Sequence, residues 1–261
     1  MAEHVYNWVP SPPDPRDILL KPLHPFVSLF TPALPPSVDL RPYCSPVVDQ
    51  GDLGSCTGNA IASGLREFMV LKSGAPLKRL SRLFVYYEER AAEGTTDEDS
   101  GANIRDGMDC ILKLGICTET LDPYNINTFK NPPSAQALAE AKDYKVTKYM
   151  RVAGLLAVKQ CLAAGYPVVA GMDVFNQMES KEAATTGIVR LPALHEQSIG
   201  GHAVTVVGYV DTPKYSPGAW KGGGKWIMRN SWGANWGDKG YFYLAYDYTN
   251  LGYMTEFWTA R

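Results

Sequence analysis

The sequence reads QGDLGSC at residues 50–56 and runs from there directly into an apolar pattern with helical spacing. Through residues 56–72 the apolar side chains recur at steps of three and four, which predicts a helix that begins at Cys56 and ends before Gly74. A thiol in the first turn of a helix lies near unpaired backbone N–H groups and the positive end of the helix dipole, so we expect its pKa to be lowered. A free cysteine is nevertheless more often buried and inert, so this position alone does not establish catalysis.

Two polar side chains further along the chain could complete a catalytic site with Cys56. His202 lies in GGHAV, where a loop enters a strand, and an imidazole there can form an ion pair with a thiolate. Asn230 follows the apolar stretch KWIM, and its amide oxygen can hold the histidine ring, with Trp232 shielding that bond from water. The structural alternatives are a histidine of the core and an asparagine of a turn. His195 is the rival histidine, but no strand follows its loop.

Gln50, six residues before the cysteine, can supply an oxyanion hole. Its side-chain NH₂ can donate to the oxyanion of a tetrahedral intermediate, and the backbone N–H of Cys56 can be the second donor. Loss of one such donor typically lowers the rate by about 10²–10³. The pattern therefore predicts acyl transfer through a thioester acyl-enzyme.

These separated motifs resemble those of the papain (C1) family of cysteine peptidases. The chain carries QGDLGSC, then HAVTVVGY, then NSWGANWGDKGY, in the order that the family shows. The resemblance runs from about residue 38 to the C-terminus and is greatest to bacterial members of the xylellain kind. It implies an endopeptidase that hydrolyses peptide bonds, needs no cofactor, and uses as catalytic residues Cys56, His202, Asn230 and Gln50.

The sequence also departs from the family pattern. Thr57 stands where the family usually has Trp or Tyr, and neither the usual disulfide ladder nor the long helical propeptide has a counterpart. We therefore expect a mostly reduced protein, although Cys44 and Cys117 could meet in the fold.

The resemblance places a substrate-binding region as well. The family's main pocket accepts the second residue upstream of the scissile bond, and glycines here would leave that pocket open to apolar side chains. A backbone edge at Gly101 and Ala102 would pair with extended substrate by β-augmentation. The other matching positions are Asn103, Ile104, Gly171, Gly201, Trp232 and, near the floor, Thr255.

Composition excludes several classes of protein. The 261 residues carry a net charge of −2 without a basic run, which argues against nucleic-acid binding. The sequence contains no run of 18 apolar residues, which a membrane-spanning helix would need. It also lacks the CxxC spacing that is typical of a zinc site. The first twenty residues do not read as a secretory signal, so we expect a cytoplasmic protein or one exported by a non-classical route.

The order of elements predicts an α+β fold of two lobes. Helices are expected early and strands late, which gives a helical lobe at about 45–150 and a β-barrel-like lobe at about 151–261, with the active site between them. Together they would form a peptidase domain over 38–261. Besides 56–72, the predicted helices are 83–92, 104–114, 134–142 and 152–164, and the predicted strands are 167–171, 203–209, 225–228 and 241–245.

Residues 1–37 form a Pro-rich arm that still carries many large apolar side chains. Proline at this density disfavours helix and favours extended chain. We expect the arm to cross the catalytic cleft as an intramolecular ligand and to act as an inhibitory prosegment. The alternatives are an arm that packs on the back of the domain and stabilises it, and a disordered leader.

Two other functions remain open at this stage. An amine instead of water could capture the acyl-enzyme, which would make the protein a transpeptidase. A non-catalytic binding module on a peptidase fold is the third possibility, although the intact set of four catalytic residues argues against it.

Overall fold

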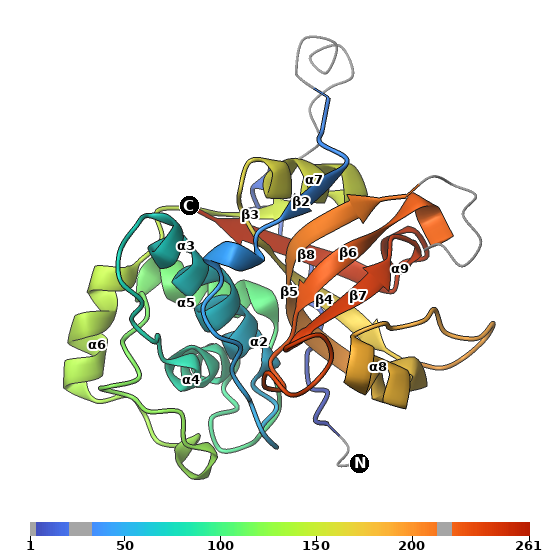
Figure 1. Cartoon of the computed structure of the whole chain (residues 1–261). Coiled ribbons are helices and arrows are strands. Elements are labelled where there is room, and N and C mark those ends of the chain that lie inside the picture. The colour runs from blue at the N-terminus through green and yellow to red at the C-terminus, as the bar shows by residue number, and fades with distance from the viewer. Residues whose placement is uncertain (1–3, 21–32, 213–220) are drawn as a thin grey trace.

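The computed structural model describes residues 4–20, 33–212 and 221–261. Figure 1 shows a group of helices beside a strongly twisted sheet, with the N-terminal segment running between them. This arrangement confirms the predicted α+β fold of two lobes. The parts of the expected arm at 21–32 and of the Gly/Pro loop at 213–220 lie outside the described residues.

The helix predicted for 56–72 is present, but its middle is wider than an α-helix. It consists of α2 (Cys56–Asn59), a π-helical segment (Ala60–Arg66) and α3 (Glu67–Lys72). Thr205 of the sheet donates a hydrogen bond of 3.1 Å to the carbonyl oxygen of Ala60, at the start of the widened stretch. π-Helical turns occur frequently at functional sites, and this one follows the short helix α2 that begins at Cys56.

Four of the six remaining α-helices in the described residues begin at polar caps. The side chains of Ser81, Asn103, Ser134 and Ser180 each accept a hydrogen bond from the first turn of their helix. The sequence did not predict the short helices α8 and α9. The helices are α4 (Arg82–Glu93), α5 (Ile104–Lys113), α6 (Ala135–Ala141), α7 (Gly154–Ala163), α8 (Lys181–Thr186) and α9 (Asp247–Asn250).

The sheet has eight strands in the order β1-β3-β8-β4-β5-β6-β7, with β2 paired to β5 off this path. All four predicted strands are present, whereas β1, β2, β3 and β8 were missed. The strands are β1 (Leu19–Leu20), β2 (Ser37–Asp39), β3 (Tyr149–Val152), β4 (Val168–Val174), β5 (Gly200–Asp211), β6 (Gly224–Arg229), β7 (Tyr241–Ala245) and β8 (Met254–Ala260).

The two lobes are held together by buried contacts along β5 and by one arginine. Arg229 is buried, and its guanidinium donates to the carbonyl oxygens of Ser45 (2.5 Å) and Pro46 (3.1 Å). Those two residues lie just before the segment that carries the cysteine. The arginine of the sheet therefore fixes the chain that leads into the nucleophile helix.

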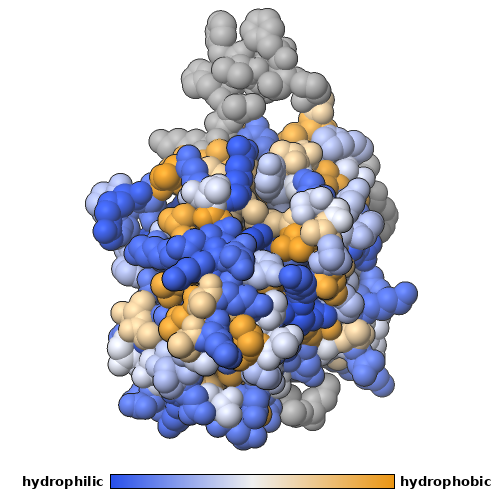
Figure 2. All heavy atoms as spheres, turned by 90° about the vertical axis from the view of Figure 1, so that its left-hand side faces the viewer, coloured by the Kyte–Doolittle hydropathy of each residue, from blue (hydrophilic) through white to orange (hydrophobic). Residues whose placement is uncertain are grey.

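The outer face of the helical lobe is mixed in character. Figure 2 shows hydrophilic side chains over most of this face, with hydrophobic patches separated from one another. Among the described residues, no helix combines the length and the apolar character that crossing a bilayer requires.

Candidate active site

Cys56 opens α2 at the interface of the two lobes and has no exposed surface. The backbone of Ala203, on β5, forms a hydrogen bond with its thiol. Since Ala203 directly follows His202, the fold brings together two residues that lie 146 positions apart in the sequence. The fold therefore places the helical-lobe thiol beside the strand that carries the β-lobe histidine, as the predicted pairing needs.

The ring of His202 is held by contacts within the β lobe. Its Nε2 lies 2.8 Å from Oδ1 of Asn230, and the same oxygen accepts a hydrogen bond of 2.9 Å from the backbone N–H of Ser231. Trp232 stacks on the imidazole with ring centroids 5.0 Å apart. Nδ1 of His202 is buried and has no hydrogen-bond partner in the described part of the chain, so it is the nitrogen left over for the thiol.

Gln50 is fully buried and its amide is fixed at both ends. Its Nε2 donates to the carbonyl oxygen of Leu53 (3.0 Å), and its Oε1 accepts from the hydroxyl of Ser231 (2.6 Å). The second hydrogen of the NH₂ group remains for another acceptor. Sequence reasoning missed Ser231 as the residue that orients this amide, although it lies inside the NSWG motif.

Burial sets the protonation of the covered site. Desolvation raises the pKa of the Cys56 thiol to about 12, although the hydrogen bond from Ala203 acts to lower it. Desolvation also lowers the pKa of His202 to about 4, although the hydrogen bond to Asn230 acts to raise it. The two groups are therefore a neutral thiol and a neutral imidazole in this structure. The lowered thiol pKa expected from the helix position is not met here, because the loss of water outweighs the helix terminus.

The arm covers this site. The backbone N–H of Trp8 donates to the carbonyl oxygen of Gly201 (2.9 Å), and that of Val9 donates to Ala102 (3.1 Å), so the arm bridges the lobes. The Trp8 side chain is 6% exposed. A Cβ atom at Gly171 or at Gly201 would collide with Trp8, so these two glycines make the room that the indole fills.

The structure thus brings most of the predicted substrate-binding positions against the arm. Ile104 belongs to the same apolar cluster as Trp8. Gly101 has a φ of +72°, which favours glycine, and the backbone of Asn7 passes directly over it. Asn103 caps α5 and accepts a hydrogen bond from Ser11 (3.2 Å).

Thr255 differs from expectation. Its side chain is exposed, whereas the next residue on β8, Glu256, is buried. Glu256 accepts hydrogen bonds from the backbone N–H of Ser11 (2.9 Å) and from the Ser11 hydroxyl. Side chains alternate along a strand, so an error of one position in the alignment exchanges the two faces of β8.

The first described residues of the arm lie on the other side of His202. His4 stacks on Trp232 with ring centroids 3.7 Å apart and forms an ion pair of 2.9 Å with Glu179. Tyr6 donates its hydroxyl to the same carboxylate and packs edge-on against His202 at 6.1 Å. Nothing in the sequence singled out Glu179, because its two partners lie more than 170 positions away.

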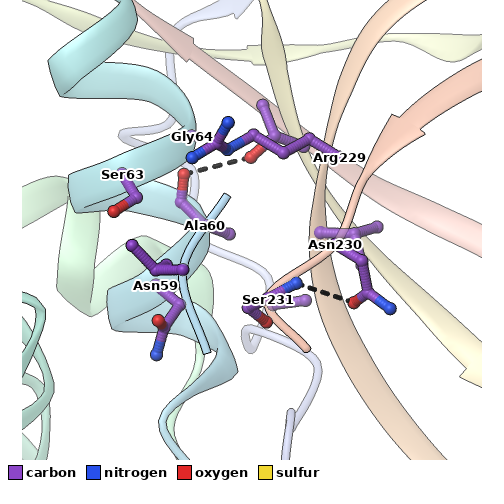
Figure 3. A pocket seen from close by; sticks show the side chains of 11 residues that line it. Asn59, Ala60, Ser63, Gly64, Arg229, Asn230 and Ser231 are labelled. Carbon is purple, nitrogen blue, oxygen red and sulfur yellow. Dashed lines mark hydrogen bonds between the residues drawn. The ribbon is translucent and has the colours of Figure 1, made fainter. Parts of the chain in front are cut away.

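Behind the catalytic residues the lobes enclose a cavity of about 10 Å³. Figure 3 shows Asn59, Ala60 and Ser63 of the helical lobe facing Asn230 and Ser231 across it. This volume is about that of one water probe, so it has no room for substrate. Within the described ranges, no group of three His, Cys, Asp or Glu side chains is arranged to hold a metal ion.

Comparison with known proteins agrees with this geometry. Residues 34–260 match the model of the papain family cysteine protease. The chain belongs to the papain family of cysteine proteases. Its catalytic class is therefore that of a hydrolase acting as a cysteine peptidase.

Individual relatives support the same assignment. A peptidase C1-like protein of Acanthamoeba polyphaga mimivirus is 36% identical, over 98% of this chain and 86% of its own length. Cathepsin K of Gallus gallus is 29% identical, and this chain spans 59% of it. Among solved structures, xylellain, a cysteine protease from Xylella fastidiosa, superimposes with a TM-score of 0.84 at 37% identity, over 98% of this chain and 95% of that one. A digestive procathepsin L 3 of Tenebrio molitor, at 22% identity and a TM-score of 0.69, shares the fold.

Membership of the papain family confirms the resemblance and the enzyme class read from the motifs. All five cysteines, which lie within the described residues, are free thiols, as expected for a mostly reduced protein. Cys44 and Cys117 pack in different clusters and do not pair.

Proposed function

We propose that the protein hydrolyses peptide bonds with Cys56 as nucleophile, His202 as its base, Asn230 as the residue that orients the ring, and Gln50 in the oxyanion hole. The observation that carries this assignment is the bond of 2.8 Å between His202 Nε2 and Asn230 Oδ1, made beside a buried thiol that contacts Ala203. Because this bond uses Nε2 of His202, Nδ1 of the same ring is left to accept the thiol proton.

The chemistry follows from that geometry. Sγ of Cys56 attacks the carbonyl carbon of the scissile bond while the thiol proton passes to His202. The proton then goes to the leaving amine as the C–N bond breaks, and the acyl group remains as a thioester. Water attacks the thioester and gives a proton to His202, which returns it to the sulfur as the carboxylic acid product leaves. The amide of Gln50 and the backbone N–H of Cys56 stabilise the oxyanion in both halves.

The Trp8 pocket supports a preference for large apolar side chains two residues upstream of the scissile bond. Its floor is opened by Gly171 and Gly201, and Ile104 contributes to the surrounding apolar cluster. Burial of a side chain as large as an indole contributes several kcal/mol of hydrophobic stabilisation at most. Substrates with Trp, Phe or Leu at that position should therefore be cleaved faster than those with Ala.

The arm is the proposed intramolecular inhibitor, and its direction supports this role. Trp8 fills the pocket expected for the second upstream residue, while Tyr6, two residues nearer the N-terminus, packs against His202. In a substrate the residues beside the catalytic histidine follow the pocket residue. The arm therefore runs in the direction opposite to that of a substrate. In this direction it covers the nucleophile but does not present a peptide bond in the orientation that can be cleaved.

Reactivity of the thiol tests the cover. Trp8→Ala removes a side chain whose burial contributes roughly 3–5 kcal/mol, so the open state should be populated more often. We expect alkylation of Cys56 by iodoacetamide at pH 7 to be at least about tenfold faster than in the wild type, with peptide hydrolysis rising in parallel. Val9→Ala is the matched control, because Val9 is the neighbouring residue and is exposed.

An arm that only stabilises the domain gives the opposite pattern. Trp8→Ala would then lower the melting temperature and leave both the alkylation rate and turnover unchanged. Hydrolysis itself is tested with a peptide library under reducing conditions and mass analysis of the products. Products joined to an added amine, in place of free carboxylic acids, would identify a transpeptidase.

A further inference from the structure

Arg105 makes an ion pair with the arm that the catalytic assignment does not use. Its guanidinium donates two parallel hydrogen bonds to the Asp17 carboxylate, Nε to Oδ1 at 2.9 Å and Nη2 to Oδ2 at 2.6 Å. The two side chains are only 10% and 9% exposed. Arg151 of β3 adds a second positive charge at 4.0 Å from the same carboxylate.

This pair continues the row of contacts that the arm makes along the cleft. Arg105 follows Ile104 in the first turn of α5, and its backbone N–H donates to the Ser11 hydroxyl (3.2 Å). Its guanidinium lies 5.6 Å over the ring of Trp258, in the same apolar cluster as Trp8. The arginine therefore stands beside the region in which we place the upstream part of a substrate.

Departure of the arm leaves Arg105 without a partner. Both hydrogen bonds recorded for its side chain in the described part of the chain go to Asp17. The arm contributes to the burial of Arg105, so its departure exposes the guanidinium and removes the acceptor of both hydrogen bonds. A guanidinium fork matches the geometry of a carboxylate or a phosphate. A peptide substrate supplies the carboxylate, so the vacated position favours an acidic side chain.

Other acidic groups of the chain face Arg105 too. Asp14, on the arm, leaves with Asp17, and Glu256 on β8 acts on the guanidinium from the opposite side. Glu256 is held by the indole N–H of Trp258 at 2.6 Å. Two arginines converge on the position of Asp17, so that position carries the stronger positive potential.

We propose that Arg105, assisted by Arg151, is a specificity site for an acidic side chain of the substrate, upstream of the pocket residue, and that Asp17 occupies it as a built-in mimic. This inference rests on the proposed peptidase function and adds to it a preference for Glu or Asp at one upstream position. The arm and an acidic substrate then compete for the same arginine.

The test compares peptides that carry Glu or Gln at each position from three to six residues upstream of the scissile bond, with Leu kept in the pocket position. It uses the full chain with Trp8→Ala, which opens the pocket, and Asp17→Asn, which removes the competing carboxylate. At one position we expect kcat/KM to be about tenfold higher for Glu than for Gln, as for a hydrogen bond to a charged group. Adding Arg105→Gln should abolish that ratio, and adding Arg105→Lys should reduce it, because lysine keeps the charge but loses the fork.

Arg190→Gln is the control, since it removes one exposed positive charge that pairs only with the surface residue Glu182. Melting temperatures establish that each variant is folded. Equal rates for Glu and Gln peptides at every position, with Arg105 intact, would overturn the specificity site while leaving the peptidase assignment standing.

A binding measurement separates the two assignments. Fluorescently labelled Glu and Gln peptides are titrated into Cys56→Ala/Trp8→Ala/Asp17→Asn protein with and without Arg105→Gln, and anisotropy gives Kd. Binding about tenfold tighter for Glu, lost with Arg105→Gln, supports the site even if no peptide is hydrolysed by the intact enzyme. Equal affinities in both proteins contradict it.

Discussion

The two lobes position their catalytic groups in different ways. On the helical lobe, Cys56 is placed by the backbone of α2, with no side-chain hydrogen bond capping that helix. On the β lobe, the imidazole of His202 is placed by other side chains, through the amide of Asn230 and the ring of Trp232. The nucleophile is therefore fixed by local structure, and the base by tertiary contacts.

Each lobe also contributes a supporting hydroxyl, and the two hydroxyls point to different tasks. Ser231 crosses to the helical lobe and orients the Gln50 amide at 2.6 Å. Thr57, next to the nucleophile, turns away into the core and donates to the carboxyl of Glu89, also at 2.6 Å. The first contact serves the chemistry and the second serves packing, so substitutions at the two sites should have separable effects.

The largest expected effect comes from the nucleophile. Cys56→Ala should lower peptide hydrolysis by about 10⁴-fold, the scale seen for catalytic triads, and leave the melting temperature nearly unchanged. His202→Ala should do nearly the same. Retention of even a tenth of the wild-type rate by Cys56→Ala contradicts the assignment, and the exposed His195→Ala is the control that should keep full activity.

The oxyanion donor should follow. Gln50→Ala removes one donor and should lower kcat by about 10²–10³. A change in KM with an unchanged kcat would show that the amide only holds the loop at residues 50–53. Pre-steady-state acylation, measured as the burst of the first product, tells whether the lost rate lies in formation of the thioester.

The two supporting hydroxyls should then separate. Ser231→Ala leaves the Gln50 amide free to turn, and loss of one hydrogen bond of about 0.5–1.5 kcal/mol predicts a fall in kcat of up to about tenfold. Thr57→Val, a substitution of similar volume, should change the free energy of unfolding and leave kcat as it is. A matching loss of kcat in both variants would remove the distinction between the lobes.

The prediction furthest from catalysis concerns the pH dependence of stability on the helical side. Glu89 is fully buried, and desolvation, with help from Glu93 and Asp106, raises its pKa well above the ordinary 4.5. An acid with a raised pKa keeps its proton in the folded state where the unfolded chain has lost it. The free energy of unfolding therefore falls as pH rises above 4.5, and it is lowest once pH exceeds the raised pKa of the folded state.

Glu89→Gln removes this titration while keeping the size of the side chain. The variant should gain stability over the wild type by about 1.4 kcal/mol for each pH unit above 4.5, up to the raised pKa of the folded protein. Urea unfolding at pH 5, 6 and 7 measures the slope. The exposed Glu98→Gln is the control for the substitution itself. A flat difference for Glu89→Gln would mean that this carboxyl is ionised in the fold.

The sequence predicted those features that depend on neighbours along the chain. The helix at 56–72, strand β5 and the motifs around Cys56, His202 and Asn230 all carry local patterns. Strand β8 was missed because six of its seven residues are buried and no alternation remains to be read. Thr255, which was expected near the floor of the pocket, has an exposed side chain, whereas its neighbour Glu256 is buried and contacts the arm.

Contacts between distant segments could not be read from the sequence. Glu179 acquires its role only when the arm lies across Trp232, and Ser231 only when the lobes close on Gln50. Arg105 and Asp17 are 88 positions apart, and neither belongs to a motif. A local pattern can name a reactive group, but the partners that hold it are set by the fold.

The burial of Cys56 also bears on how the resting protein withstands oxidants. Oxidation of a cysteine to sulfenic acid requires both thiolate and access, and the covered nucleophile has neither, since it has no exposed surface and its pKa is raised to about 12. Peroxide should therefore spare the closed protein and inactivate the open one. If the arm is the proposed cover of the cleft, it also keeps the thiol reduced, and reductant becomes necessary only once the cleft has opened.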